Sequence, residues 1–207
     1  MTLLAVLDYE IGNLRSAQKA LEHLGADARL TADPSLIREA DGVVLPGVGA
    51  FGRCMEAVRD AGLEPLVHEV VERGTPFLGI CIGMQLLFEA SEETPGVTGL
   101  GVLPGTVRLL PGDVKRPQMQ WNLLERRGDP ELLRQAPDPA WAYFVHSYAA
   151  DTEDELVIAT CDYGSAVTAA VARGNVWATQ FHPEKSSRTG LAVLQAFVDR
   201  AASVVPA

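Results

Sequence analysis

A strand that runs directly into a helix is predicted by Leu78-Gly79-Ile80-Cys81-Ile82-Gly83-Met84-Gln85-Leu86-Leu87. Residues 75–80 form a short apolar segment, and residues 84–90 contain good helix formers with no glycine or proline. Cys81 therefore lies at a tight turn with a glycine two residues to either side. Such a turn strains the backbone at its apex, and the glycines let strand and helix pack closely around it.

The turn also gives Cys81 a chemical setting that the other two cysteines lack. It places the thiol beside a helix N-terminus, where the free N–H groups and the helix dipole favour thiolate over thiol. We therefore expect Cys81 to be a nucleophile. Cys54 and Cys161 have no comparable surroundings, and we expect them to pack as small hydrophobic side chains.

The composition is that of a globular protein, and we expect one domain over residues 1–207. Hydrophobic residues make up 47% of the chain and charged residues 21%. The net charge of -10 argues against nucleic acid as a partner, because phosphate binding needs a basic surface. No apolar run reaches the roughly 20 residues of a membrane span. With 3 cysteines a disulfide framework is not expected, and we predict a cytoplasmic, reduced protein without metal or cofactor.

Alternating strands and helices in the first half predict an α/β fold with a mostly parallel central sheet flanked by helices. Strands are expected at 2–8, 28–30, 42–45 and 75–80, and helices at 14–24, from 33 onward, at 54–73 with a break near Gly62 and Pro65, and at 84–90. The C-terminal half adds an antiparallel β portion, with strands at 106–110, 141–148, 156–161, 166–173 and 176–181 before a helix at 190–202. Ligand sites in such sheets form at the carboxyl ends of strands, where the loop after Asp8, the loop 46–49 and the Cys81 turn all lie.

A nucleophilic cysteine needs a base and a group that orients it, and Phe181-His182-Pro183-Glu184 offers both. Side chains two residues apart on an extended segment point to the same face, and Pro183 favours an extended His182. We expect Glu184 to accept a hydrogen bond from one ring nitrogen and leave the other for sulfur. His146 is the alternative base, but its strand has no acidic neighbour.

The segment Pro46-Gly47-Val48-Gly49 ends a predicted strand and is a candidate oxyanion site. Its glycines let backbone N–H groups approach a substrate closely. A plain turn is the alternative. A phosphate loop is disfavoured because no lysine, serine or threonine follows at the required spacing.

Taken together, the G-x-C-x-G turn with Gln85, the P-G-V-G loop and the F-H-P-E segment resemble the class I, triad-type glutamine amidotransferases. Further matches at 8–9, 12–16, 46–51, 143–148 and 181–186 resemble one branch of that family, the glutaminase subunits of imidazole glycerol phosphate synthase. The resemblance covers nearly the whole chain and implies a flavodoxin-like fold.

The resemblance implies a role for each matching residue. Cys81 attacks the side-chain amide of L-glutamine, His182 transfers protons and Glu184 orients it, while Val48 and Gly49 form the oxyanion strand. Gly49, Gln85, Ser147 and Tyr148 match substrate-binding positions. The residues that match a partner interface are Asn13, Trp121, Asn122, Tyr143 and Lys185.

The implied partner is a separate (β/α)₈ cyclase subunit in a heterodimer. Ammonia travels to this subunit, which makes imidazole glycerol phosphate and an aminoimidazole carboxamide ribotide in histidine biosynthesis. A barrel of that kind needs about 250 residues, so it must be another polypeptide. Glycines at 47 and 49 also permit a flip of the Val48 peptide that would form the oxyanion site only with the partner occupied.

Three residues depart from the family pattern. Glu10 replaces a usual glycine, and Gln118 and Gln120 replace the usual histidine and glycine of a P-H-M-G-W-N segment in the expected interface.

Two other functions remain open as alternatives. One is a glutaminase subunit for pyridoxal phosphate or GMP synthesis, and the other is a catalytically inactive regulatory module on the same fold.

Overall fold

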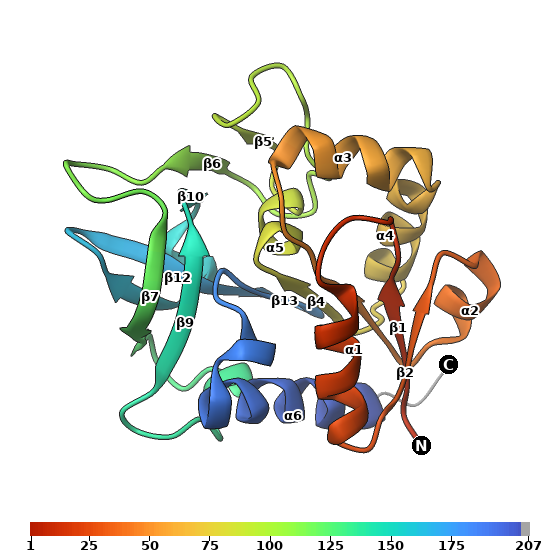
Figure 1. Cartoon of the computed structure of the whole chain (residues 1–207). Coiled ribbons are helices and arrows are strands. Elements are labelled where there is room, and N and C mark those ends of the chain that lie inside the picture. The colour runs from red at the N-terminus through yellow and green to blue at the C-terminus, as the bar shows by residue number, and fades with distance from the viewer. Residues whose placement is uncertain (204–207) are drawn as a thin grey trace.

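The computed structural model describes residues 1–203 and is built around an eight-stranded sheet with the order β2-β1-β3-β4-β13-β12-β11-β8 (Figure 1). The first five strands in this order are parallel, and the pairs β13–β12, β12–β11 and β11–β8 are antiparallel. The bounds are β1 (Leu3–Leu7), β2 (Asp27–Thr31), β3 (Gly42–Leu45), β4 (Phe77–Ile80), β8 (Glu125–Arg126), β11 (Val157–Asp162), β12 (Ala166–Arg173) and β13 (Val176–Thr179).

Helices cover both faces of this sheet, as the sequence predicts. Leu4 and Val6 of β1 pack in one hydrophobic cluster with α1 and α6, whereas Ala5 and Leu7 pack in a second cluster with α2, α3, α4 and α5. This alternation follows from the two-residue period of a strand. The helices are α1 (Leu14–His23), α2 (Pro34–Glu39), α3 (Phe51–Asp60), α4 (Leu63–Glu72), α5 (Ile82–Leu86) and α6 (Ser187–Ser203), with 3-10 turns η1 (Glu131–Leu133), η2 (Asp154–Leu156) and η3 (Pro183–Lys185).

Two small sheets lie beside the main sheet, and together with the antiparallel strands β11 and β12 of the main sheet they account for the expected antiparallel portion (Figure 1). One contains β5 (Ala90–Ser91), β6 (Thr106–Leu109) and β10 (Tyr148–Asp151), and the other pairs β7 (Gln118–Leu123) with β9 (Trp141–His146). The single strand predicted at 141–148 is wrong, because the chain leaves β7 after His146 and joins β6 at Tyr148. The strand β7 was not among the predicted strands.

The long helix expected at 54–73 is divided at Gly62, as its glycine indicates. Gly62 has φ 67°, and Pro65 lies in the first turn of α4, where its missing N–H costs no helical hydrogen bond. The helix expected at 84–90 is wrong in extent, because α5 ends at Leu86. The Leu86 and Leu87 carbonyls accept hydrogen bonds from Leu100 and Leu103, 2.8 and 2.9 Å away, so a loop replaces the next helical turn.

Glu10 occupies a backbone conformation that explains why glycine is usual at its position. Its φ is 63°, in the left-handed region that strains residues other than glycine. Its N–H donates to the Asp8 carboxylate at 3.1 Å, which helps to hold the turn.

None of the helices in residues 1–203 is both long enough and apolar enough to cross a membrane.

Candidate active site

Cys81 lies at the apex of a strained turn between β4 and α5. Its backbone has φ 55° and ψ -110°, and its N–H donates to the Thr179 carbonyl at 2.8 Å. A Cβ on Gly83 would lie 1.8 Å from the Leu45 carbonyl oxygen, and one on Gly79 would lie 3.0 Å from the Gly83 oxygen. The strain and the close packing predicted from the glycines are therefore confirmed.

A pocket of about 380 Å³ opens onto Cys81. It is lined by residues from four distant parts of the chain: Val48, Gly49, Cys81, Ile82, Gln85, Glu93, Pro117, Val145, His146, Ser147 and Tyr148. The candidate nucleophile, the candidate oxyanion loop and the candidate substrate-binding residues thus share one pocket. They meet because β3 and β4 are parallel neighbours that end at the same edge of the sheet.

His182 and Glu184 form a buried pair at the end of the neighbouring strand β13. The Nδ1 atom of His182 lies 2.8 Å from Oε1 of Glu184, and the two side chains are 2% and 4% exposed. The opposite ring nitrogen, Nε2, is buried and has no hydrogen-bond partner among residues 1–203, so it is left for a reacting group. Burial lowers the pKa of His182, but the interactions with Cys81 and Glu184 outweigh it and raise the pKa to about 9.

The extended backbone predicted for this pair is confirmed for His182 and wrong for Glu184. His182 is extended, with φ -94° and ψ 98°, but Glu184 belongs to the 3-10 turn η3 and not to an extended segment. Pro183 begins that turn, for which its fixed φ is suited. The turn, rather than strand alternation, directs the carboxylate to the imidazole.

His146 differs from His182 in the direction of its pKa shift and in the partner of its Nδ1 atom. Burial lowers its pKa to about 4, so its imidazole is neutral. Its Nδ1 lies 2.8 Å from the Tyr148 carbonyl oxygen and donates to it, which leaves Nε2 as a buried acceptor at the pocket. His146 therefore shapes the pocket wall beside Ser147 and Tyr148.

The loop 46–49 is held from the side of β1. The Tyr9 hydroxyl donates to the Pro46 carbonyl at 2.7 Å, and a Cβ on Gly47 would lie 1.8 Å from that hydroxyl. Within residues 1–203 the N–H groups of Val48 and Gly49 make no hydrogen bond to another residue. The Val48 carbonyl faces the Cys54 thiol at 3.8 Å. Two residues that line the pocket thus have backbone donors without a partner in the described part of the chain.

Gln85 is part of a buried amide network behind the nucleophile. Its Nε2 donates to the Tyr148 carbonyl and to Oε1 of Gln180, both at 2.9 Å. Nε2 of Gln180 in turn lies 3.8 Å from the Cys81 sulfur.

Two further residues, Gln180 and Glu93, lie at the site without having been predicted there. The only signal for Gln180 was its place two residues before His182. Glu93 lies in a loop without a recognisable pattern, yet its carboxylate lines the pocket and accepts from the Phe51 N–H at 2.7 Å.

The five candidate interface residues do not all lie together. Trp121 and Tyr143 are opposite one another on β7 and β9, with ring centroids 6.1 Å apart. Asn122 lies on the other face of β7, where its amide donates to the Asp162 carbonyl at 2.8 Å. Asn13 and Lys185 are exposed at the start of α1 and in η3. Gln120 is exposed but Gln118 is fully buried, so Gln118 does not belong to an outer surface as expected.

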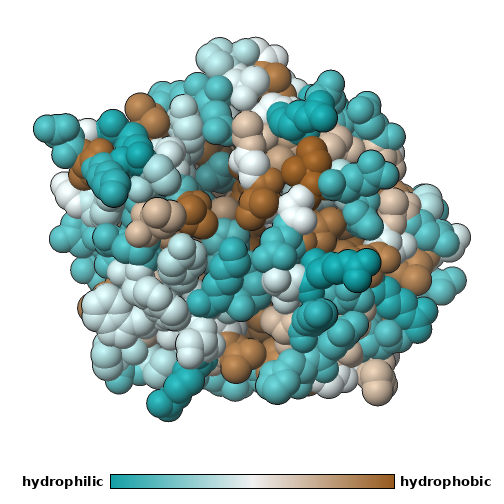
Figure 2. All heavy atoms as spheres, viewed as in Figure 1, coloured by the Kyte–Doolittle hydropathy of each residue, from teal (hydrophilic) through white to brown (hydrophobic). Residues whose placement is uncertain are grey.

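An exposed apolar surface surrounds Trp121, and we call it the β7–β9 face. Its large exposed side chains are Met119 at 61%, Trp121 at 47%, Leu123 at 37% and Trp141 at 48%. The strand register places them on one side, since Trp121 is opposite Tyr143 and Leu123 is opposite Trp141. Figure 2 shows hydrophobic residues elsewhere on the viewed side as well, grouped around a hollow near its centre.

Tyr143 also links the β7–β9 face to the candidate base. Its carbonyl accepts from the His182 N–H at 3.0 Å, and its N–H donates to the Ser186 hydroxyl oxygen at 2.9 Å. That hydroxyl donates to the His182 carbonyl at 2.7 Å. The strand β9 is therefore hydrogen-bonded directly to the backbone of His182.

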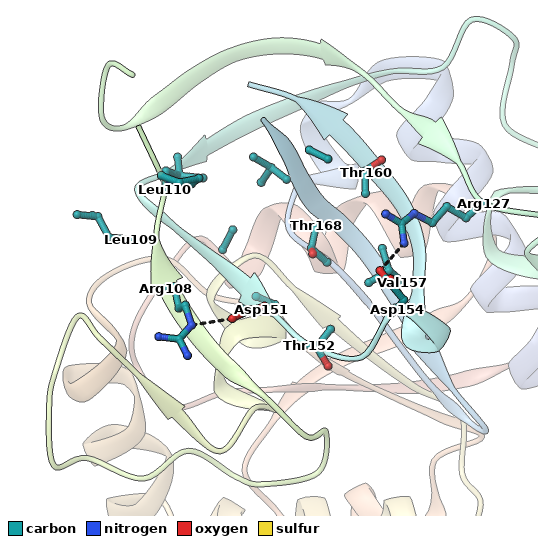
Figure 3. Close-up of a pocket in the computed structure, with 15 residues that line it drawn as sticks. Arg108, Leu109, Leu110, Arg127, Asp151, Thr152, Asp154, Val157, Thr160 and Thr168 are labelled. Atoms are coloured by element: carbon teal, nitrogen blue, oxygen red, sulfur yellow. Dashed lines mark hydrogen bonds and ion pairs between the residues drawn. The ribbon is translucent and has the colours of Figure 1, made fainter. Parts of the chain in front are cut away.

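A second hollow of about 320 Å³ lies between β6, β10, β11 and β12 (Figure 3). Its two arginines point to carboxylates: Arg108 pairs with Asp151 at 2.7 Å and Arg127 with Asp154 at 2.8 Å. Because their charges are already balanced, the hollow offers little attraction to an anion. The pocket at Cys81 is the better candidate site.

A family model described as "Glutamine amidotransferase class-I" matches residues 5–201. A protein of Bacillus cereus strain G9842 called imidazole glycerol phosphate synthase subunit HisH is 47% identical over 195 residues, which are 94% of this chain and 93% of the relative. The chain belongs to the class-I glutamine amidotransferases, in the HisH branch.

Other comparisons agree with this membership. The HisH subunit of Moorella thermoacetica is 48% identical to this class-I amidotransferase, over 95% of this chain and 94% of the relative. A solved structure described as a glutamine amidotransferase superposes with a TM-score of 0.76 at 23% identity, covering 96% of this chain and 98% of the other. A chain from the PurLQS structure of Thermotoga maritima gives 0.75 at 20% identity, covering 96% and 98%. These two structures establish the fold, and the HisH relatives establish the branch.

Proposed function

We propose that this class-I amidotransferase is the glutaminase subunit of imidazole glycerol phosphate synthase, with Cys81, His182 and Glu184 as its catalytic residues. The observation that carries the proposal is a buried His182–Glu184 pair 2.8 Å apart beside a cysteine that opens onto a pocket. A nucleophile, its base and an orienting carboxylate are the parts that acyl transfer requires.

The reaction proceeds in two steps. The thiolate of Cys81 attacks the side-chain carbonyl carbon of glutamine, and the N–H groups of Val48 and Gly49 hold the resulting oxyanion. Protonated His182 gives its proton to the departing ammonia, which leaves a γ-glutamyl thioester. Neutral His182 then takes a proton from water, the hydroxide attacks the thioester, and glutamate departs while Cys81 becomes a thiolate again.

Polar groups around the pocket match the rest of a glutamine molecule. Gln85, Ser147 and Tyr148 supply amide and backbone groups beside Gly49, and all four line the pocket. The carboxylate of Glu93 lies at the same pocket and complements the α-ammonium group of an amino acid.

The product ammonia needs a protected route to its acceptor, and the proposal assigns that role to a (β/α)₈ cyclase subunit in a heterodimer. That subunit makes imidazole glycerol phosphate and an aminoimidazole carboxamide ribotide in histidine biosynthesis, in the cytoplasm. The β7–β9 face supports docking, because its aromatic residues are typical of interface anchors. Asn13 and Lys185 are exposed, as an interface residue must be, whereas Asn122 contributes from the opposite side of β7.

The test uses the complex reconstituted with its cyclase subunit. Cys81→Ala is expected to abolish synthesis with glutamine as nitrogen donor while synthesis with added ammonium salts persists. Cys161→Ala, at another buried cysteine, is the matched control and should retain both activities. Glutamine-dependent synthesis by Cys81→Ala would refute the assignment of the nucleophile. Loss of both activities in the intact complex would refute the assignment of ammonia as the transferred product.

A further inference from the structure

Gln180 is a fully buried amide between the candidate nucleophile and a candidate substrate-binding residue. It is 0% exposed and lies between β13 and His182. Its backbone N–H donates to the Ala169 carbonyl at 2.8 Å, so the segment is fixed to β12. Its side chain extends from there to both Cys81 and Gln85.

The hydrogen-bond network determines which way the Gln180 amide points. Gln85 contacts the Tyr148 carbonyl, which only accepts, so the Gln85 atom at that position is its NH₂ group. The same NH₂ group lies 2.9 Å from Gln180, which must therefore present its oxygen. The NH₂ group of Gln180 is left to face the Cys81 sulfur at 3.8 Å.

An N–H donor aimed at sulfur favours thiolate, because a hydrogen bond to an ionised acceptor is stronger than one to a neutral acceptor. Burial strengthens the effect, since Cys81 and Gln85 are only 6% and 4% exposed. The same side chain fixes the Gln85 amide through its oxygen. One residue thus contacts both the Cys81 sulfur and a side chain in the wall of the substrate pocket.

We propose that Gln180 is a positioning residue of the glutaminase reaction, which stabilises the Cys81 thiolate with its NH₂ group and holds Gln85 with its oxygen. The proposal rests on the function proposed above. The NH₂ group of Gln180 is assigned to the thiolate and its oxygen to Gln85. One variant can remove the NH₂ group alone, and a second can remove both groups.

Gln180→Glu keeps the shape and an oxygen acceptor for Gln85 but replaces the donor to sulfur by a carboxylate oxygen, whose negative charge also repels a thiolate. In the reconstituted complex, kcat is expected to fall about tenfold or more with KM for glutamine within twofold, because the loss of a hydrogen bond to a charged group alone has roughly a tenfold effect. Gln180→Met removes both ends and should also raise KM severalfold. Gln118→Met is the matched control, since Gln118 is equally buried and faces the Cys161 sulfur at 3.8 Å.

Alkylation of Cys81 by iodoacetamide at fixed pH, followed by mass spectrometry of its peptide, reports the thiolate without any need for glutamine turnover. The rate should fall about tenfold in Gln180→Glu and Gln180→Met and stay unchanged in Gln118→Met. Unchanged alkylation and kcat in both Gln180 variants would overturn the proposal. If Cys81→Ala retained glutaminase activity, the proposed function would fail, yet the alkylation rates would still test the contact. If Gln180→Glu does not fold, as judged by circular dichroism, Gln180→Met alone decides.

Discussion

The Cys81 turn and the β7–β9 face hold their candidate functional side chains in opposite surroundings, one buried and the other exposed. The Cys81 turn is buried, strained and packed so closely that an added Cβ at Gly83 would meet a backbone carbonyl. The β7–β9 face is a two-stranded sheet whose outer side leaves Trp121 and Trp141 about half exposed. The first region is completed by contacts within the chain, and the second has apolar area that only another molecule can cover. The proposed chemistry thus lies where the backbone is most constrained, and the proposed docking surface where apolar side chains are exposed.

The largest effect is expected from filling the space at the Cys81 turn. Gly83→Ala should lower the free energy of unfolding by about 3 kcal/mol or more, because its Cβ would lie 1.8 Å from the Leu45 oxygen. Gly25→Ala is the control for backbone strain alone, since Gly25 has a positive φ, 86°, but no atom lies within 4 Å of its added Cβ, whereas Gly83 has the close contact without a positive φ. Urea unfolding of both variants makes the comparison. A loss at Gly83 no larger than the loss at Gly25 would contradict the close packing assigned to the Cys81 turn.

The next effect concerns the proton on His182. Glu184→Gln should lower kcat for glutamine hydrolysis about 10²-fold, because an uncharged partner orients the imidazole less well and no longer stabilises its charge. The pKa of His182, about 9 in the native protein, should fall toward its ordinary value of 6.5. The alkaline limb of the kcat profile should therefore move to lower pH. A profile that keeps its alkaline limb would contradict this account.

The same pair makes stability depend on pH. Since folding raises the pKa of His182, its contribution to the free energy of unfolding is complete below about pH 6.5 and is lost as the pH rises through about 9. Glu184→Gln should weaken this dependence between those limits. Urea unfolding of both proteins across this range measures it.

The smallest effect should appear at the β7–β9 face, and only with the partner present. Trp121→Ala is expected to weaken the complex with the cyclase subunit about 30-fold, a common effect for an aromatic interface anchor, with little change in the unfolding of the isolated subunit. Leu109→Ala is the control, because Leu109 is 42% exposed but lies on β6, outside this face. Calorimetric titration compares them. Equal weakening by both variants would mean that the β7–β9 face is not the docking surface.

The sequence predicted the Cys81 turn well because the residues that signal it are local. Glycines at 79 and 83, an apolar strand and a helix-forming run lie within a few residues, although the carbonyl that Gly83 packs against belongs to Leu45 of the neighbouring strand β3. The predicted extent of α5 was wrong because a segment distant in sequence decides it. The loop at 100–103 donates hydrogen bonds to carbonyls that a longer helix would have used itself. The turn at Glu184 was likewise set by Pro183 in a way that alternation along a strand does not describe.

The parts that were missed depend on pairing between distant segments. The sequence of β7 does alternate polar and apolar residues from Gln118 to Leu123, but its pairing with β9 and the exposure of its apolar side appear only in the structure. Gln180 gains its place only when β13 lies beside β4, which brings its amide to Cys81. The position of Asn122 on the far side of β7 from Trp121 also required the strand register.

The proposed function depends above all on Cys81 being the nucleophile that attacks glutamine. The most direct measurement is covalent labelling of the complex by 6-diazo-5-oxo-L-norleucine, a glutamine-like electrophile, with the modified peptide identified by mass spectrometry. We expect one adduct, on Cys81, that excess glutamine suppresses, with Cys54 and Cys161 unmodified. An adduct on another residue, or no adduct in a complex that still hydrolyses glutamine, would contradict it.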